Sequence, residues 1–182
     1  MFDIKRWTPF ICCLLLAACA SVLGPREVEL PQDRLQTALE RKFPLHQRVL
    51  ELFDLTLTRP QLQIQPEFDR VQLSMEVAML PRFGGQGWTG SMALSGRLEL
   101  DPVRHAVLLR EAHVERLELD RLDGERRNQL ARVGSVLLDR VLKDGTLYTF
   151  APDELRRAGV QFTPTRIVTQ PGALRITLEP VR

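Results

Sequence analysis

The 182-residue chain carries 25 lysine and arginine residues against 23 aspartate and glutamate residues, a net charge of +2 at pH 7. The charges are interspersed, so no basic stripe argues for nucleic-acid binding and no acidic tail argues for disorder. With 44% of its residues hydrophobic, the chain can form one domain with a substantial core. The cysteines are Cys12, Cys13 and Cys19, so the rest of the chain must fold without a disulfide.

The N-terminal segment has the parts of a secretory signal peptide. Lys5 and Arg6 supply positive charge, and an apolar run follows from Trp7 to Ala18. A run of about a dozen apolar residues that ends in small side chains is typical of an export signal, whereas a membrane-spanning helix needs about twenty. We therefore expect residues 1–18 to be a signal peptide.

The end of this segment, the sequence LAAC at Leu16–Cys19, resembles the bacterial lipobox. In a lipobox the cysteine thiol receives a diacylglyceryl group and becomes the new N-terminus after cleavage. The resemblance implies a lipoprotein with a lipidated Cys19. The short polar stretch that follows predicts a tether over residues 19–29, and the remaining length predicts a single domain over residues 30–182. Ala20 stands where the enterobacterial sorting rule would place aspartate for inner-membrane retention. It therefore favours the periplasmic face of the outer membrane in a bacterial cell envelope.

Two amphipathic helices are predicted. The first runs from about Pro31 to Lys42, because proline suits a first helical turn and Pro44 ends the pattern. Its apolar face consists of Leu35, Ala38, Leu39 and Phe43, at helical spacing. The second is predicted over residues 124–145, with an apolar stripe along its length and a glycine at its end.

Long alternating stretches between these helices predict antiparallel strands. Residues 71–79 alternate most regularly, with one polar and one apolar face. Residues 55–64 alternate on either side of a break at Arg59-Pro60, and residues 88–100 follow the glycine-rich turn FGGQGW. The apolar residues of 106–119 slip phase, which indicates bulges. Long strands with interior glycines and bulges must twist and curl.

The C-terminal part completes the expected order of elements. It contains a short extended piece at 146–150, a brief helical turn at 152–154, and two strands at 160–169 and 174–178. Strands flanked by helices predict an α+β fold. We expect a strongly curved antiparallel sheet of about four to six long strands wrapped around one or two amphipathic helices.

Four stretches resemble a known family: the lipobox and the segments LERKFP, LLDRVLKDGTLYTF and GVQFTPTRIVTQPGALRITL. With the order of elements, they resemble the YceB-like bacterial lipoproteins, whose function is not established. That family is similar in fold to tubular lipid-binding (TULIP) domains, in which a highly curved sheet wraps a long helix and leaves an apolar channel. The resemblance implies binding of a lipid or another hydrophobic molecule.

One face of two neighbouring predicted strands is the candidate lining of an apolar channel. Its residues are Leu73, Met75, Val77, Met79, Trp88, Met92 and Leu94. Three of the four methionines fall here, and flexible methionine side chains suit promiscuous apolar surfaces. Gly90 and Gly96 share the parity of Trp88 and are expected to leave space. The sequence leaves open the alternative of an ordinary packed core filled by helix side chains.

The sequence contains no pattern that predicts catalysis, a metal site or a cofactor. No G-x-S-x-G occurs, and the cysteine that remains after cleavage would be consumed by lipid. His46 stands alone. His105 and His113 lie on one predicted strand, roughly 26 Å apart at about 3.3 Å per residue, so they cannot share a metal ion. We therefore expect a protein that is not an enzyme.

The sequence as a whole predicts a membrane-anchored periplasmic lipoprotein that binds a lipid or other hydrophobic ligand in an apolar channel, for transfer or sensing. Its expected partners are the membrane, through the N-terminal acyl chains, and the hydrophobic ligand, but not nucleic acid. The alternative is an envelope scaffold or interaction lipoprotein with a packed core and no ligand.

Overall fold

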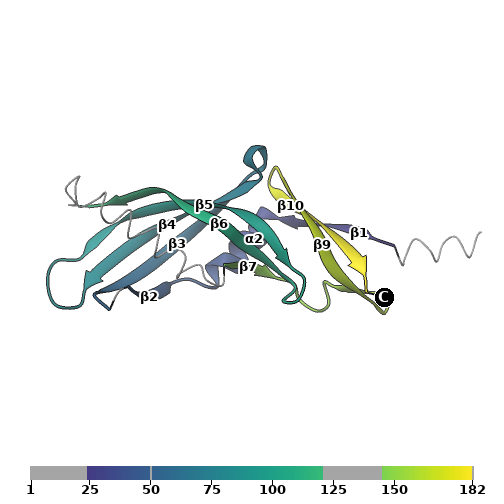
Figure 1. Ribbon diagram of the computed structural model, residues 1–182, viewed down its shortest axis with the longest axis horizontal. Helices are drawn as coiled ribbons and strands as arrows, with labels where there is room; N and C mark the ends of the chain where they lie inside the picture. The colour runs from purple at the N-terminus through teal and green to yellow at the C-terminus, as the bar shows by residue number, and fades with distance from the viewer. Residues whose placement is uncertain (1–23, 50, 121–144, 182) are drawn as a thin grey trace, which may run out of the picture.

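The computed structural model describes residues 24–49, 51–120 and 145–181, which form two antiparallel sheets placed one after the other along the long axis (Figure 1). The six-stranded sheet has the order β2 (Leu45–Val49), β3 (Phe53–Gln65), β4 (Arg70–Pro81), β5 (Trp88–Asp101), β6 (Ala106–Leu119) and β7 (Thr146–Thr149). The four-stranded sheet has the order β1 (Arg26–Pro31), β10 (Ala173–Pro180), β9 (Val160–Gln170) and β8 (Arg156–Arg157).

The expected α+β class is wrong, because the described part of the chain is nearly all sheet. Strands hold 67% of these residues and helical segments 9%. Within the described ranges, the one α-helix is α2 (Gln32–Glu40), and η2 (Pro66–Phe68) is a single 3-10 turn. The helix expected over 124–145 lies outside the described residues, apart from its last residue. The helical turn expected at 152–154 is a non-helical turn that leads into β8.

The second sheet forms because the first strand of the described chain pairs with the last. Val28 lies opposite Ile176 and Leu30 opposite Leu174, so apolar pairs line one face of the β1–β10 ladder. This pairing draws the C-terminal hairpin into a sheet of its own, which is why the expected single sheet does not form. Arg26–Glu29 were expected in the tether, so the folded part begins earlier than the sequence indicated.

Helix α2 confirms the first predicted helix and covers an open sheet edge. β2 pairs only with the first part of β3, up to Leu57. Beyond that point, the backbone N–H of Leu62 donates to Gln36 Oε1 at 2.8 Å, and Gln36 Nε2 donates to the carbonyl of Pro60 at 2.7 Å. Glutamine side chains of the helix thus satisfy strand groups that would otherwise stand unpaired at an edge.

Bulges keep the long strands facing one core. In β3, Arg59 has a φ of 49° and the register with β4 shifts between Thr58 and Gln61. The shift keeps Leu57 and Leu62 on the same face although their parity differs. In β6, Glu111 has a φ of 47° and the register with β5 shifts twice. The phase slips predicted a bulged strand, and the structure confirms it.

A single hydrophobic core extends across both sheets. It joins Leu73 and Leu94 of the large sheet to Phe162 and Ile176 of the small sheet and to Leu35 of α2. The opposite face of the large sheet carries exposed cross-strand ion pairs such as Arg59–Glu76, at 2.7 Å. Among the residues described, no helix is long and apolar enough to cross a bilayer.

Candidate functional site

The seven residues predicted to line a channel lie together on the inner face of the six-stranded sheet. Side chains alternate across a strand, so β4 presents every second residue to this face. The antiparallel register sets Leu73 opposite Leu94 and Met75 opposite Met92. The same register sets Met79 opposite Trp88. The alternation in the sequence therefore located one continuous apolar surface correctly.

Burial divides this inner face into a closed part and a half-open end. The closed part is buried, with 1 to 7% of each side chain exposed: Leu73, Met75, Val77, Met79 and Leu94. Trp88 and Met92 are only partly buried, as are Phe53 and Leu55 of β3 and Leu117 of β6, which pack against the same core. We call these last five residues the half-open end. Phe53, Leu55 and Leu117 were not among the residues that the sequence predicted for the lining, although Leu55 and Leu117 lie in stretches with alternating apolar residues.

An aromatic pair stands at the half-open end. The rings of Phe53 and Trp88 lie with centroids 6.1 Å apart and planes tilted by 59°. Leu55 lies opposite Met79, and Leu117 lies opposite Met92. The half-open end therefore adjoins the buried part of the face at Met79. All five side chains of the half-open end are apolar.

The glycines of β5 do not leave the space that was expected. A Cβ added at Gly90 would overlap the carbonyl oxygen of Glu118 and lie 2.9 Å from the Cα of Leu119. At Gly96 it would lie 2.7 Å from Leu109 Cδ1 and 2.8 Å from the carbonyl oxygen of Arg110. The expectation of empty space is wrong, because the bulged backbone of β6 approaches β5 closely at both positions.

A polar cluster on the other face of the sheet brings together serine, histidine and arginine. Ser95 is fully buried, and its Oγ lies 3.2 Å from His113 Nε2. Arg70 donates from Nε to Ser95 Oγ at 3.3 Å, and its Nη2 lies 3.0 Å from His113 Nδ1.

The tautomer of His113 argues against a Ser–His catalytic pair. A guanidinium can only donate, so His113 Nδ1 must accept the Arg70 bond and the ring proton sits on Nε2. Nε2–H then donates toward Ser95 and cannot take a proton from it. The cluster fastens β4, β5 and β6. Among the described residues, no group of three or more His, Cys, Asp or Glu could hold a metal ion.

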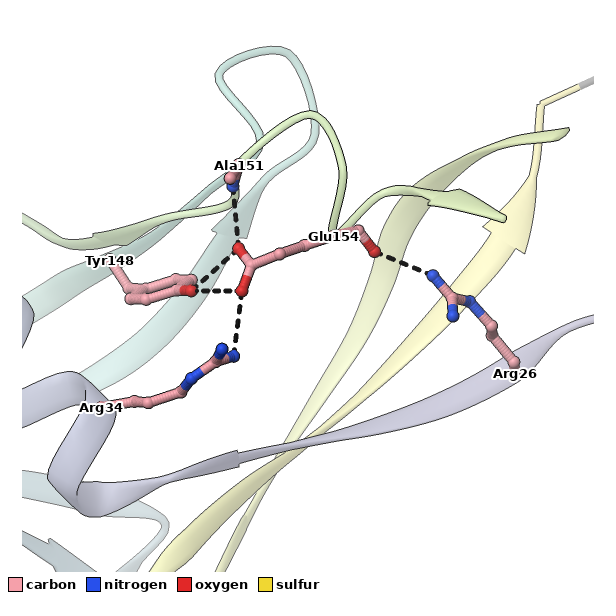
Figure 2. Close-up of polar contacts among 5 residues, drawn as sticks. All are labelled: Arg26, Arg34, Tyr148, Ala151 and Glu154. Carbon is pink, nitrogen blue, oxygen red and sulfur yellow. Dashed lines mark hydrogen bonds and ion pairs between the residues drawn. The ribbon is translucent and has the colours of Figure 1, made fainter. Parts of the chain in front are cut away.

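A second polar cluster centres on Glu154 at the junction of the two sheets (Figure 2). Its carboxylate accepts bonds from Tyr148 OH at 2.7 Å, the N–H of Ala151 at 2.8 Å and Arg34 Nη1 at 3.0 Å. Its backbone carbonyl accepts from Arg26 Nη2 at 2.8 Å, and Arg26 lies 4.7 Å from the centroid of the Phe162 ring. Sequence reasoning missed this cluster, because its arginines lie more than a hundred residues from Glu154.

Tyr148 gives this cluster a measurable signature. Burial, and then the hydrogen bond and charge of Glu154, raise the pKa of Tyr148 to about 12. Tyr148 is the one tyrosine of the chain, so ultraviolet absorbance at alkaline pH reports its ionisation alone. We expect a midpoint near pH 12 in the folded protein and about 10 in the unfolded protein.

The raised pKa of Tyr148 makes the stability of the folded protein depend on pH in the alkaline range. The neutral phenol stabilises the folded state below about pH 10, and this contribution is lost as the pH rises from about 10 to about 12. Glu154→Gln should lower the midpoint, because the carboxylate charge no longer opposes phenolate formation. A titration curve unchanged by Glu154→Gln would contradict the proposed coupling.

Fold and site together define a two-sheet β protein with an apolar inner face that is only partly buried at one end. No protein-family model and no curated protein matches the chain, so membership of the YceB-like family is not established. Among solved structures, the crystal structure of a lipopolysaccharide binding protein is similar at 13% sequence identity, with a TM-score of 0.34. The alignment covers 85% of this chain and 40% of that one. At this level of likeness, function must be argued from the site itself.

Proposed function

We propose that the protein binds the hydrocarbon part of a lipid or another hydrophobic ligand at the half-open end of its inner face. The observation that carries the proposal is the position of Trp88 and Met92, which are partly buried next to the part of the face that the core closes. Each ligand CH₂ withdrawn from water there contributes about 0.8 kcal/mol. The buried residues Leu73, Met75, Val77, Met79 and Leu94 form the floor beneath the ligand. Function as a carrier for transfer or sensing belongs to the same proposal.

The arrangement supports binding without chemistry. The half-open end presents only apolar side chains, and the Ser95–His113 pair lies on the other face in the wrong tautomer. Adaptable methionines suit a ligand of variable shape. We therefore propose a binding protein that is not an enzyme.

Native mass spectrometry of the protein extracted from membranes tests this function. We expect one bound lipid or other hydrophobic molecule per chain. A chain that carries no ligand and remains attached to a protein partner would instead support the envelope scaffold with a packed core.

We further propose that the protein acts from a membrane, as a YceB-like lipoprotein anchored through Cys19. The lipobox-like sequence at Leu16–Cys19 supports this anchor. One acyl chain gives only reversible attachment, with an association constant of about 10⁴ M⁻¹, so stable attachment needs further chains. The outer membrane of a bacterial envelope is the proposed location, from the identity of Ala20.

Cys19→Ser should leave the precursor without acyl groups and move it from the membrane fraction to the soluble fraction. Cell fractionation with metabolic labelling by a fatty acid measures both effects. Unchanged membrane association of an unlabelled Cys19→Ser chain would refute the anchor while leaving the ligand site untouched.

A further inference from the structure

Two adjoining turns at the end of the large sheet expose a group of large apolar side chains. Leu52, in the turn between β2 and β3, is 45% exposed. Leu80, at the end of β4, is 56% exposed, and Phe83, in the loop between β4 and β5, is 81% exposed. We call these three residues the apolar tip. They account for three of the seven large apolar residues that are exposed in the described part of the chain.

Hydrogen bonds and ion pairs hold the two turns together. The backbone N–H of Arg82 donates to the carbonyl of Leu52 at 2.9 Å. The Arg82 side chain lies 3.5 Å from Glu51 and 4.0 Å from Asp54, and Arg48 lies 3.6 Å from Glu51. Two cations and two anions therefore lie beside the apolar tip, with no net charge among them.

The loop that carries Phe83 projects away from the protein. Gly84 and Gly85 have φ values of 89° and 117°, a conformation that favours glycine. A Cβ added at Gly84 would meet nothing within 4 Å. Figure 1 places this loop at one extreme of the long axis and β1 at the other. The tip can therefore meet a surface independently of an anchor that precedes β1.

The apolar tip adjoins the half-open end. Leu52 precedes Phe53 in the chain, and Phe53 lies opposite Pro81 in the β3–β4 register. Phe53 also packs against Trp88. Leu80 alternates with the buried Met79 and therefore lies on the outer face, so Leu52 and the loop of Phe83 are the parts of the tip next to the half-open end.

We propose that the apolar tip inserts shallowly into a lipid layer and that the hydrophobic ligand passes there between the layer and the inner face. The second half of this proposal rests on the proposed function. A stable protein interface uses about 20 to 30 residues on each side, far more than this tip offers to a protein partner or to a second copy. Shallow insertion needs only a few apolar side chains next to charged groups that can stay at headgroup level, and the tip has both.

Binding to phosphatidylcholine vesicles tests the insertion, with the full chain carrying Cys19→Ser so that no acyl anchor contributes. We expect Phe83→Ser to lower the vesicle partition coefficient about tenfold, the value of withdrawing one such side chain from water. Phe68→Ser is the matched control, because Phe68 is 64% exposed on a different turn; it should leave partition unchanged. Any contribution of residues 1–18 to vesicle binding is the same in all variants, so it cancels when their partition coefficients are compared as a ratio.

Hydrogen exchange locates the contact. Vesicles should protect the amides of residues 51–54 and 80–87, and adding phosphatidylglycerol should change little, because the charges beside the tip balance. The proposal would be overturned if Phe83→Ser and Phe68→Ser lowered the vesicle partition coefficient equally, or if vesicles protected neither of these two segments. So would a Phe83-dependent dimer in sedimentation experiments without vesicles.

Ligand binding distinguishes failure of the tip proposal from failure of the proposed function. The Phe83→Ser chain would still bind the ligand if only the tip proposal fails, whereas no variant would bind it if the proposed function is wrong.

Discussion

Gly90→Ala is expected to destabilise the folded protein by about 3 kcal/mol, the upper end of the usual range for overpacking. The added methyl group would overlap the carbonyl oxygen of Glu118 and come within 2.9 Å of the Leu119 Cα. Both obstacles are backbone atoms of the neighbouring strand, which cannot rotate aside as a side chain does. Urea denaturation followed by circular dichroism measures the loss.

Gly84→Ala is the matched control for this change. Its Cβ would meet nothing within 4 Å, so it reports only the cost of an alanine at positive φ, about 1 kcal/mol. Equal stability of the Gly90→Ala and Gly84→Ala proteins would show that β5 and β6 do not approach as closely as described here.

Met92→Asn is expected to weaken binding of a hydrophobic ligand about ten- to hundredfold. An amide buried without a partner costs about 1–3 kcal/mol, and each 1.4 kcal/mol is a factor of ten in affinity. Met92 is partly buried at the half-open end, so the fold should tolerate a polar group there better than at Leu94, which is 1% exposed. Displacement of a fluorescent fatty acid measures the affinity.

Ser91→Asn controls for the asparagine itself. Ser91 is the neighbour of Met92 on the same strand, but its side chain lies on the exposed outer face. The Ser91→Asn chain should bind the hydrophobic ligand with the affinity of the unmodified chain and should have a similar melting temperature. If both variants bind alike, the ligand does not contact the inner face at Met92.

Local patterns predicted the strands well. The alternation of residues 71–79 became β4, and its apolar positions are all buried. The slipped phase of residues 106–119 became the bulges of β6. Both patterns are properties of consecutive residues on a pleated strand, so a single sequence displays them directly.

Long-range pairing could not be predicted in the same way. β1 is short and stands next to the helix α2, so nothing local indicates that it pairs with β10 near the end of the chain. That pairing creates a second sheet where a single sheet was expected. The junction around Glu154 is equally non-local, since Arg26 and Arg34 reach it from the first elements of the described chain.

The glycines of β5 were misinterpreted for a different reason. A missing side chain can mean an empty space or the close approach of another backbone, and the sequence does not distinguish the two. In this protein the approach of β6 fills both positions. The proposed ligand site consequently lies at the half-open end, around Trp88 and Phe53, and not beside the glycines.

Quenching of Trp88 fluorescence by a brominated fatty acid tests the central claim most directly. The chain contains two tryptophans, Trp7 and Trp88, so Trp7→Phe leaves one reporter at the site. The account predicts saturable quenching at one ligand per chain, shifted to higher concentration by Met92→Asn and unchanged by Ser91→Asn. A ligand that binds at this stoichiometry without quenching Trp88, or no binding at all, would contradict it.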